Sequence, residues 1–94
     1  MFNTSEEKKA EYWNHFVFEF KPHPFGFTKK RLERVKPMIW NDADFWDDVI
    51  HRHGGQDKTP GEMANASQQT YQHCFGNMAG MIRHTMQRQG ILKY

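Results

Sequence analysis

The residues from Thr59 to Gly90 constrain the fold most, because they read as one long helix. Thr59-Pro60-Gly61-Glu62 has the form of a capping box with proline at the first helical position, and Gly90 is the expected stop. A helix of about 30 residues is about 45 Å long, which exceeds the diameter of a 94-residue globule. The sequence therefore predicts that this helix either breaks near Gly76 or Gly80 or projects and pairs with another chain.

This predicted helix has an apolar face and an opposite polar face when successive residues are placed about 100° apart. The apolar face holds Met63, Tyr71, Cys74, Phe75, Met78, Met81, Ile82 and Met86. The polar face holds Gln69, Gln72, His73, Gly76, Gly80, Arg83, His84 and Gln87. A glycine in a helix interior costs about 1 kcal/mol relative to alanine, and packing does not obviously require either of the two on the polar face. We therefore expect another group to approach this backbone closely.

The polar face is the candidate binding surface. Gly76 and Gly80 have the spacing of a close helix–helix contact, although that motif is strongest in membranes. Three interpretations are open: a partner helix packing on the glycines, a phosphate-bearing ligand lying across them, or an ordinary crossing with another helix of the same chain. The candidate residues for binding a protein partner or an anion are Gly76, Gly80, Arg83, His84, His73 and Gln87.

The N-terminal quarter of the chain predicts a helix followed by a loop. Thr4-Ser5-Glu6-Glu7 is a second capping box, and apolar residues then recur at helical spacing, so we expect a helix over about residues 5–18. Residues 16–20 are aromatic and partly alternating, which also fits a short strand. Residues 21–27 contain two prolines and a glycine, so they predict a loop.

Two further helices are predicted in the middle of the chain. Thr28 can cap a short basic helix that runs to about Lys36, where Pro37 ends or kinks it. Asn41 or Asp42 can cap a third helix, which the Gly54-Gly55 pair closes. Its first two turns are rich in aspartate, and the helix dipole is a sufficient structural reason for most of that charge.

Together these patterns predict an all-α single domain over residues 1–94, with about four helices ending in a long C-terminal helix. At this length the chain supports one modest core. The apolar stripes of the helices predict a core formed by Trp13, Phe16, Phe45, Trp46, Val49, Phe75, Met78 and Ile82. Residues 91–94 are expected to form a tail.

The charge distribution suggests an alternative binding surface. The formal net charge is only +2, so the chain as a whole does not resemble a nucleic-acid-binding protein. Residues 21–36, however, carry six basic side chains against a single acidic one, and aromatic residues lie among them. Such combinations occur where bases stack on rings and phosphates meet cations. The candidate residues for nucleic-acid contact are Lys29, Lys30, Arg31, Arg34, Phe25 and Phe27.

Several classes of function are not supported by the sequence. The single cysteine, Cys74, rules out an intramolecular disulfide, lies on the apolar face, and is expected to be a core residue in a reducing compartment. His51 and His53 would diverge on a helix, so we expect no metal. No catalytic or phosphate-cradling motif is present, and we expect neither an enzyme nor a cofactor. The chain has no apolar run of about 18 residues and no secretory signal pattern, so we expect no membrane contact and a cytoplasmic location.

The sequence therefore predicts a small, non-catalytic protein that acts by binding another protein. Its size and its aromatic and methionine content suit an inhibitor or regulator that covers a working surface of a host complex, as proteins of phages and other mobile elements do. A homo-oligomer formed through the long helix is one expected form of this interaction. The alternative is a nucleic-acid-binding regulator that uses the basic residues 21–36.

Overall fold

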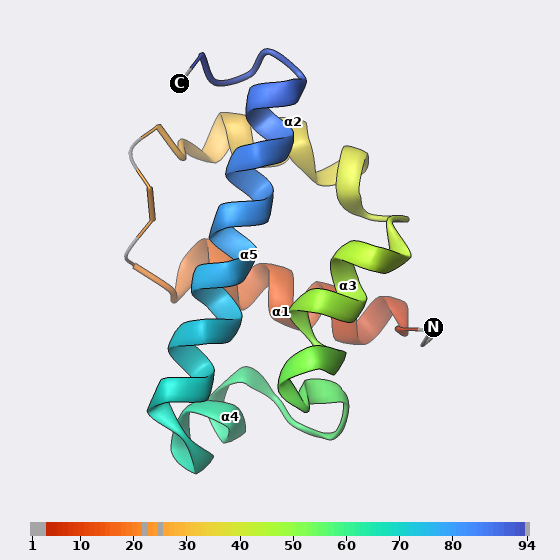
Figure 1. The fold of residues 1–94 in the computed structure, drawn as a ribbon, viewed down its shortest axis with the longest axis vertical. Coiled ribbons are helices and arrows are strands. Elements are labelled where there is room, and N and C mark those ends of the chain that lie inside the picture. Colours follow the sequence, from red (N-terminus) through yellow and green to blue (C-terminus); the bar gives the residue numbers. More distant parts are fainter. Residues whose placement is uncertain (1–3, 22, 25, 94) are drawn as a thin grey trace.

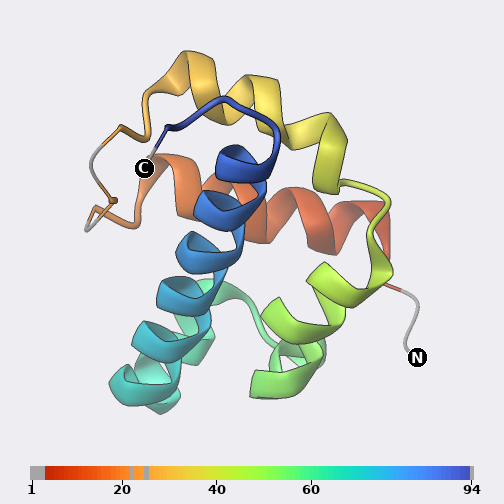
Figure 2. The same cartoon turned by 45° about the horizontal axis from the view of Figure 1, so that its top comes forward.

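The computed structural model describes residues 4–21, 23–24 and 26–93. The elements along the chain are α1 (Glu6–Phe18), α2 (Lys29–Ile39), α3 (Ala43–Val49), the 3-10 turns η1 (His51–His53) and η2 (Gly55–Asp57), α4 (Pro60–Ala66) and α5 (Gln68–Arg88). Helices α1 and α2 run in opposite directions, and α5 crosses them with α3 beside it (Figures 1 and 2). No strand occurs within the described ranges, so the predicted all-α class is confirmed.

The first helix forms as predicted, with its cap shifted by one residue. Ser5 is the N-cap, and its hydroxyl accepts from the backbone N–H of Lys8 at 3.1 Å. The helix continues to Phe18, so residues 16–18 do not adopt the alternative strand. Residues 19–21, 23–24 and 26–28 contain no helix, which agrees with the predicted loop.

Helix α2 continues past Pro37 to Ile39, so of the two predicted outcomes, an end or a kink at this proline, the end is wrong. Thr28 caps the helix by accepting from the N–H of Arg31 at 3.2 Å. Pro37 lies in the last turn, where its missing N–H removes only one bond of the helical ladder. Extending the helix to Ile39 places that side chain one turn beyond Val35 on the buried face. The burial of Ile39 therefore favours the longer helix.

Helix α3 begins where the sequence indicated. The Asp42 carboxylate accepts from the N–H groups of Asp44 and Phe45, at 3.1 and 3.3 Å. After α3 and η1, Gly54 adopts a left-handed conformation with φ of 70°. The chain then turns through η2 towards α4.

The predicted helix over residues 59–90 is wrong, because the chain breaks at Ser67. This residue is extended (φ −160°, ψ 110°), and its hydroxyl accepts from the N–H of Thr70 at 3.2 Å. Ser67 thus ends α4 and caps α5, while α5 runs unbroken through Gly76 and Gly80. At about 1.5 Å per residue, α5 is shorter than the longest dimension of the protein, 36 Å. The oligomer was expected because a helix of about 30 residues would project beyond the globule. Helix α5 does not exceed the protein's longest dimension, so its length gives no reason to expect an oligomer.

All eight predicted core residues are buried. The core also contains residues that the sequence analysis placed elsewhere. Ile91 and Leu92, expected in a tail, are only 6% and 3% exposed. Their backbone N–H groups donate to the Met86 carbonyl at 2.8 and 3.2 Å, which folds this segment back over the end of α5. Within the described ranges, no helix is both long enough and apolar enough to cross a membrane.

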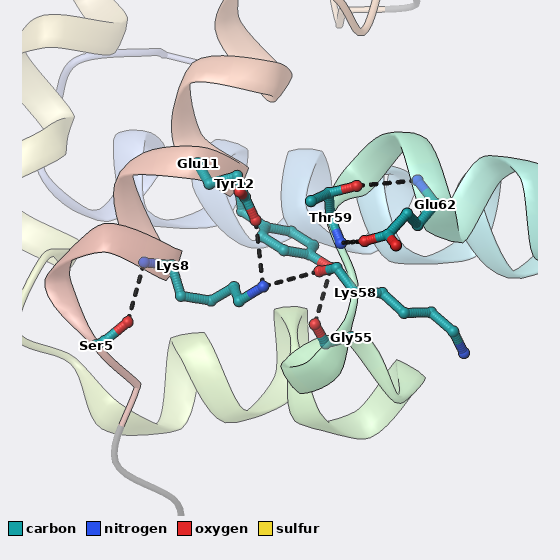
Figure 3. Close-up of polar contacts among 8 residues, drawn as sticks. All are labelled: Ser5, Lys8, Glu11, Tyr12, Gly55, Lys58, Thr59 and Glu62. Atoms are coloured by element: carbon teal, nitrogen blue, oxygen red, sulfur yellow. Dashed lines mark hydrogen bonds and ion pairs between the residues drawn. The ribbon is translucent and has the colours of Figure 1, made fainter.

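The junction between α1 and the segment leading to α4 is organised by Tyr12, whose side chain is fully buried. Its hydroxyl lies 3.2 Å from the Gly55 carbonyl oxygen and 3.1 Å from that of Lys58, and it donates its proton to them (Figure 3). The Lys8 ammonium also donates to the Lys58 carbonyl, at 2.9 Å. On its other side, the Tyr12 ring stacks on Phe75 of α5 with centroids 5.7 Å apart. Tyr12 therefore connects three segments of the fold.

We predict that Tyr12→Phe lowers the free energy of unfolding by about 1–2 kcal/mol, because a buried hydrogen bond is lost while the ring still packs. Urea denaturation measures this change. Tyr71→Phe is the control: its hydroxyl contacts His15 Nε2 at 2.7 Å in a half-buried site where water can substitute. A loss for Tyr12→Phe no larger than that for Tyr71→Phe would contradict the role given to the Tyr12 hydroxyl.

Candidate functional site: the groove between α3 and α5

A groove of about 360 Å³ lies between the first turns of α3 and the C-terminal half of α5. Its lining residues come from both helices and comprise Asp42, Asp44, Phe45, Asp48, Gly76, Asn77, Gly80, Met81, His84, Thr85 and Arg88. The two helices lie side by side in both views (Figures 1 and 2). Part of the predicted polar face of α5, including Gly76, Gly80 and His84, therefore forms one wall of a groove.

A second hollow of about 440 Å³ continues the groove towards η1. It is lined by Arg52, His53, Gln72, His73, Gly76 and Asn77. Because Gly76 and Asn77 line both hollows, the two form one groove along α5. From Gln72 to Arg88 this groove is about 24 Å long at 1.5 Å per residue. We use the name α3–α5 groove for both hollows together.

The two glycines leave open space in this groove. A Cβ atom placed on either Gly76 or Gly80 would meet no atom outside its own helical turn within 4 Å. Both residues are exposed. The third interpretation of the glycines, an internal helix crossing, is therefore wrong, since no other element contacts α5 closely at these positions.

The charged side chains on the two walls of the groove differ in sign. Asp42 and Asp44 are exposed on the α3 side, and the Asp48 carboxylate lies 3.6 Å from the Arg52 guanidinium. On the α5 side, His84 and Arg88 are exposed. The groove thus has an acidic wall on α3, and the Arg88 guanidinium supplies positive charge towards the end of α5.

The structure brings four of the six predicted residues together. Gly76, Gly80 and His84 line the first hollow, and His73 lines the second together with Gly76. Arg83 and Gln87 are exposed on α5, but they line neither hollow. Each lies seven residues, or about 20° in helical phase, from one of the glycines, so they share the glycine face of α5 but lie outside the two hollows.

The sequence analysis missed Asn77 and Arg88, which also line the groove. Asn77 follows Gly76 and was not assigned to the polar face. Arg88 lies about two turns beyond Gly80 and about 80° around the helix from it, at the edge between the polar and apolar faces, so the helical pattern alone did not assign it to the polar face. The acidic wall required the packing of α3 beside α5, which no local pattern reports.

The predicted nucleic-acid residues occupy different environments. Lys29, Lys30 and Arg34 are exposed on α2. Arg31 is half-buried, and its guanidinium donates to the Gly26 carbonyl at 3.0 Å. Phe27 is 9% exposed and packs edge-on against a core ring, so its ring is not open to a base. The prediction for Phe25 falls outside the described residues.

Cys74 lies in the core rather than in the α3–α5 groove. Cys74 is fully buried, its thiol donates to the Val49 carbonyl at 3.0 Å, and burial raises its pKa to about 12. This thiol is protonated and inert at neutral pH. No cluster of three or more metal-ligating side chains occurs in the ranges that the structure covers.

No protein-family model, no curated protein and no solved structure matches this chain.

We predict opposite effects of alanine at glycines inside and outside the groove. Gly76→Ala and Gly80→Ala should each raise the free energy of unfolding by up to about 1 kcal/mol, because the methyl group meets open space and improves helix propensity. Gly55→Ala should lower it, because its Cβ would lie 2.5 Å from the Tyr12 hydroxyl oxygen. Chemical denaturation of the three variants tests this, and a destabilised Gly80→Ala would contradict the open groove.

We also predict that acidification destabilises the η1 end of the groove. Burial lowers the pKa of His53 below its ordinary value of 6.5, and the positive charges of Arg52 and His73 lower it further. The unfolded chain therefore takes up this proton at a higher pH than the folded protein does. The contribution of neutral His53 to folding stability is present above pH 6.5. It is lost as the pH falls from 6.5 towards the lowered pKa of His53 in the folded protein. The melting temperature of His53→Gln should fall less steeply with acidification than that of the wild type. Parallel curves of melting temperature against pH for the two proteins would contradict the prediction.

Proposed function

We propose that this protein acts by binding a helical segment of a partner protein in the α3–α5 groove. The observation that carries the proposal is the open space above Gly76 and Gly80, which lie one turn apart on the groove wall. Two glycines in one exposed helix cost about 2 kcal/mol relative to alanine. Among the residues that the structure describes, no other segment uses the close approach that they permit.

The dimensions of the groove support a helix as its occupant. A length of about 24 Å accommodates about four helical turns of 5.4 Å each. Glycines at this spacing let a second helix backbone approach closely, and amphipathic helices commonly bind in such grooves. Phe45 and the half-buried Met81 supply apolar surface beside the glycines. The occupant can therefore bury an apolar edge against this part of the groove.

The charges favour a protein segment over a phosphate-bearing ligand. Asp42 and Asp44 line the same hollow as Gly80 and form no salt bridge among the described residues, so their carboxylates would repel a phosphate lying there. A polypeptide can present basic side chains to the α3 wall and acidic ones to His84 and Arg88. Opposite charges on the two walls would then fix the orientation of the bound helix.

A binding role also fits the placement of the titratable groups that burial perturbs most. Burial raises the pKa values of Tyr12 and Cys74 strongly, and both side chains lie in the core rather than in the groove. Binding requires no such group. We propose that the protein is a non-catalytic regulator or inhibitor that works by binding a helix of its partner in the α3–α5 groove.

We predict that Gly80→Leu remains folded and loses the partner. The leucine side chain would fill the space above the helix, whereas the buried face of α5 is unchanged. Gly80→Ala controls for the loss of glycine itself. Gly61→Leu is the matched control outside the groove, since Gly61 is exposed on α4 and lines neither hollow.

The measurement has two steps. Proteins retained from cell extract by the immobilised wild type are identified, and the affinity of each purified candidate is then determined for the variants. The expected partner binds the wild type, Gly80→Ala and Gly61→Leu but not Gly80→Leu, with unchanged melting temperatures. A partner that binds Gly80→Leu as tightly as the wild type would place the interface elsewhere.

A further inference from the structure

A second surface, formed by α1 and α2, shares no residue with the α3–α5 groove. It contains a cleft of about 150 Å³ whose apolar residues include Trp13, Val17 and Leu32. Phe18 borders this cleft and is 57% exposed. Lys29, at the start of α2, lines the same cleft. An exposed aromatic ring and a cation therefore lie beside one apolar hollow.

The exposure of Phe18 follows from its helical phase. The buried residues of α1 are Tyr12, Trp13 and Phe16, and Phe18 lies about 200° around the helix from Phe16. A single exposed apolar side chain is common in proteins. Phe18 differs from Met38, the other large apolar side chain exposed in the described residues, because only Phe18 borders the cleft.

Three cations of α2 have no ion-pair partner among the described residues, and one of them, Lys29, lines the cleft. Lys29, Lys30 and Arg34 are exposed on α2, and none forms a salt bridge there. The neighbouring cations are engaged: Arg31 donates to a backbone carbonyl at 3.0 Å, and the Lys36 ammonium lies 4.9 Å from the Trp40 ring centroid. The free cations lie on the outer side of α2, one turn apart at residues 30 and 34.

We infer that this surface binds single-stranded nucleic acid. One base stacks on the exposed Phe18 ring at the mouth of the cleft, and the phosphates contact Lys29, Lys30 and Arg34. An open ring beside one cation, Lys29, with two more cations further around the same helix, resembles the combination of ring and positive charge that single-strand binding surfaces use without reading a particular sequence. The inference does not rest on the proposed function, because it concerns different helices.

The observations favour a single strand over the two other polyanions that cations attract. A duplex keeps its bases stacked within the helix, so it has no free base for Phe18. An acidic peptide would meet the same cations, but it offers a flat ring to Phe18 only where it carries an aromatic side chain, whereas every nucleotide carries a base. Glu33 also lines the cleft, so its negative charge weakens the binding of any polyanion there.

The test is fluorescence anisotropy of labelled oligothymidylate titrated with the intact protein at low and at raised salt. Phe18→Ala should weaken binding about tenfold or more, the loss expected for one stacked base. Its fold should persist because the side chain is largely exposed. Phe18→Trp should restore or exceed wild-type affinity, since a larger ring stacks at least as well. Met38→Ala, the matched exposed apolar control on α2, should change nothing.

The charge variants test the phosphate contacts. Lys30→Ala and Arg34→Ala should each reduce the slope of log affinity against log salt by about 0.7. Glu33→Gln should tighten binding. The inference would be overturned if the wild type did not bind the oligonucleotide at low salt. It would also be overturned if Phe18→Ala bound as tightly as the wild type. Equal binding of a matched duplex would overturn it as well, and so would Phe18-dependent binding of polyglutamate, which would identify a site for acidic peptides.

Discussion

The buried Tyr12 side chain is the contact on which the arrangement of the other elements depends. Its ring stacks on Phe75 of α5, and its hydroxyl holds the carbonyls of Gly55 and Lys58. The close approach requires a glycine, because a Cβ at position 55 would lie 2.5 Å from the phenol oxygen. The segment that follows α3 is thereby tied to α1, while α5 is tied to the other side of the same ring. Tyr12 thus helps to set the separation of α3 and α5, and with it the groove.

The groove carries an energetic cost that the rest of the fold must offset. Gly76 and Gly80 together forgo about 2 kcal/mol of helix propensity, which is a substantial fraction of the 5–15 kcal/mol typical of a whole domain. The apolar face of α5 supplies the offset, because Phe75, Met78 and Ile82 are fully buried. A fully buried side chain of this kind contributes about 1.5–3 kcal/mol. The helix can therefore remain stable while its opposite face stays open for a partner.

Local signals predicted the helices well and their connections poorly. The caps at Thr28 and Asp42 and the buried stripes follow from sequence spacing alone, and both are observed. The break at Ser67 was missed because the apolar positions on its two sides stay in one helical register. Only the capping hydroxyl of Ser67 marked the break. The helix through Pro37 and the burial of Leu92 depend on contacts made by distant segments. Such contacts override local propensity and leave no trace in a short window of sequence.

The same distinction explains which parts of the two surfaces could be predicted. Gly76 and Gly80 could be assigned to one face because a helix fixes the phase of its residues, whereas the acidic wall opposite them required the packing of α3. Phe27 lies in a loop, where no periodicity fixes its direction, and its ring packs into the core. Phe18 lies in a helix, and its phase relative to Phe16 already placed it away from the buried face. An aromatic residue next to a basic segment is thus more informative when it is helical, because its exposure can then be derived before the fold is known.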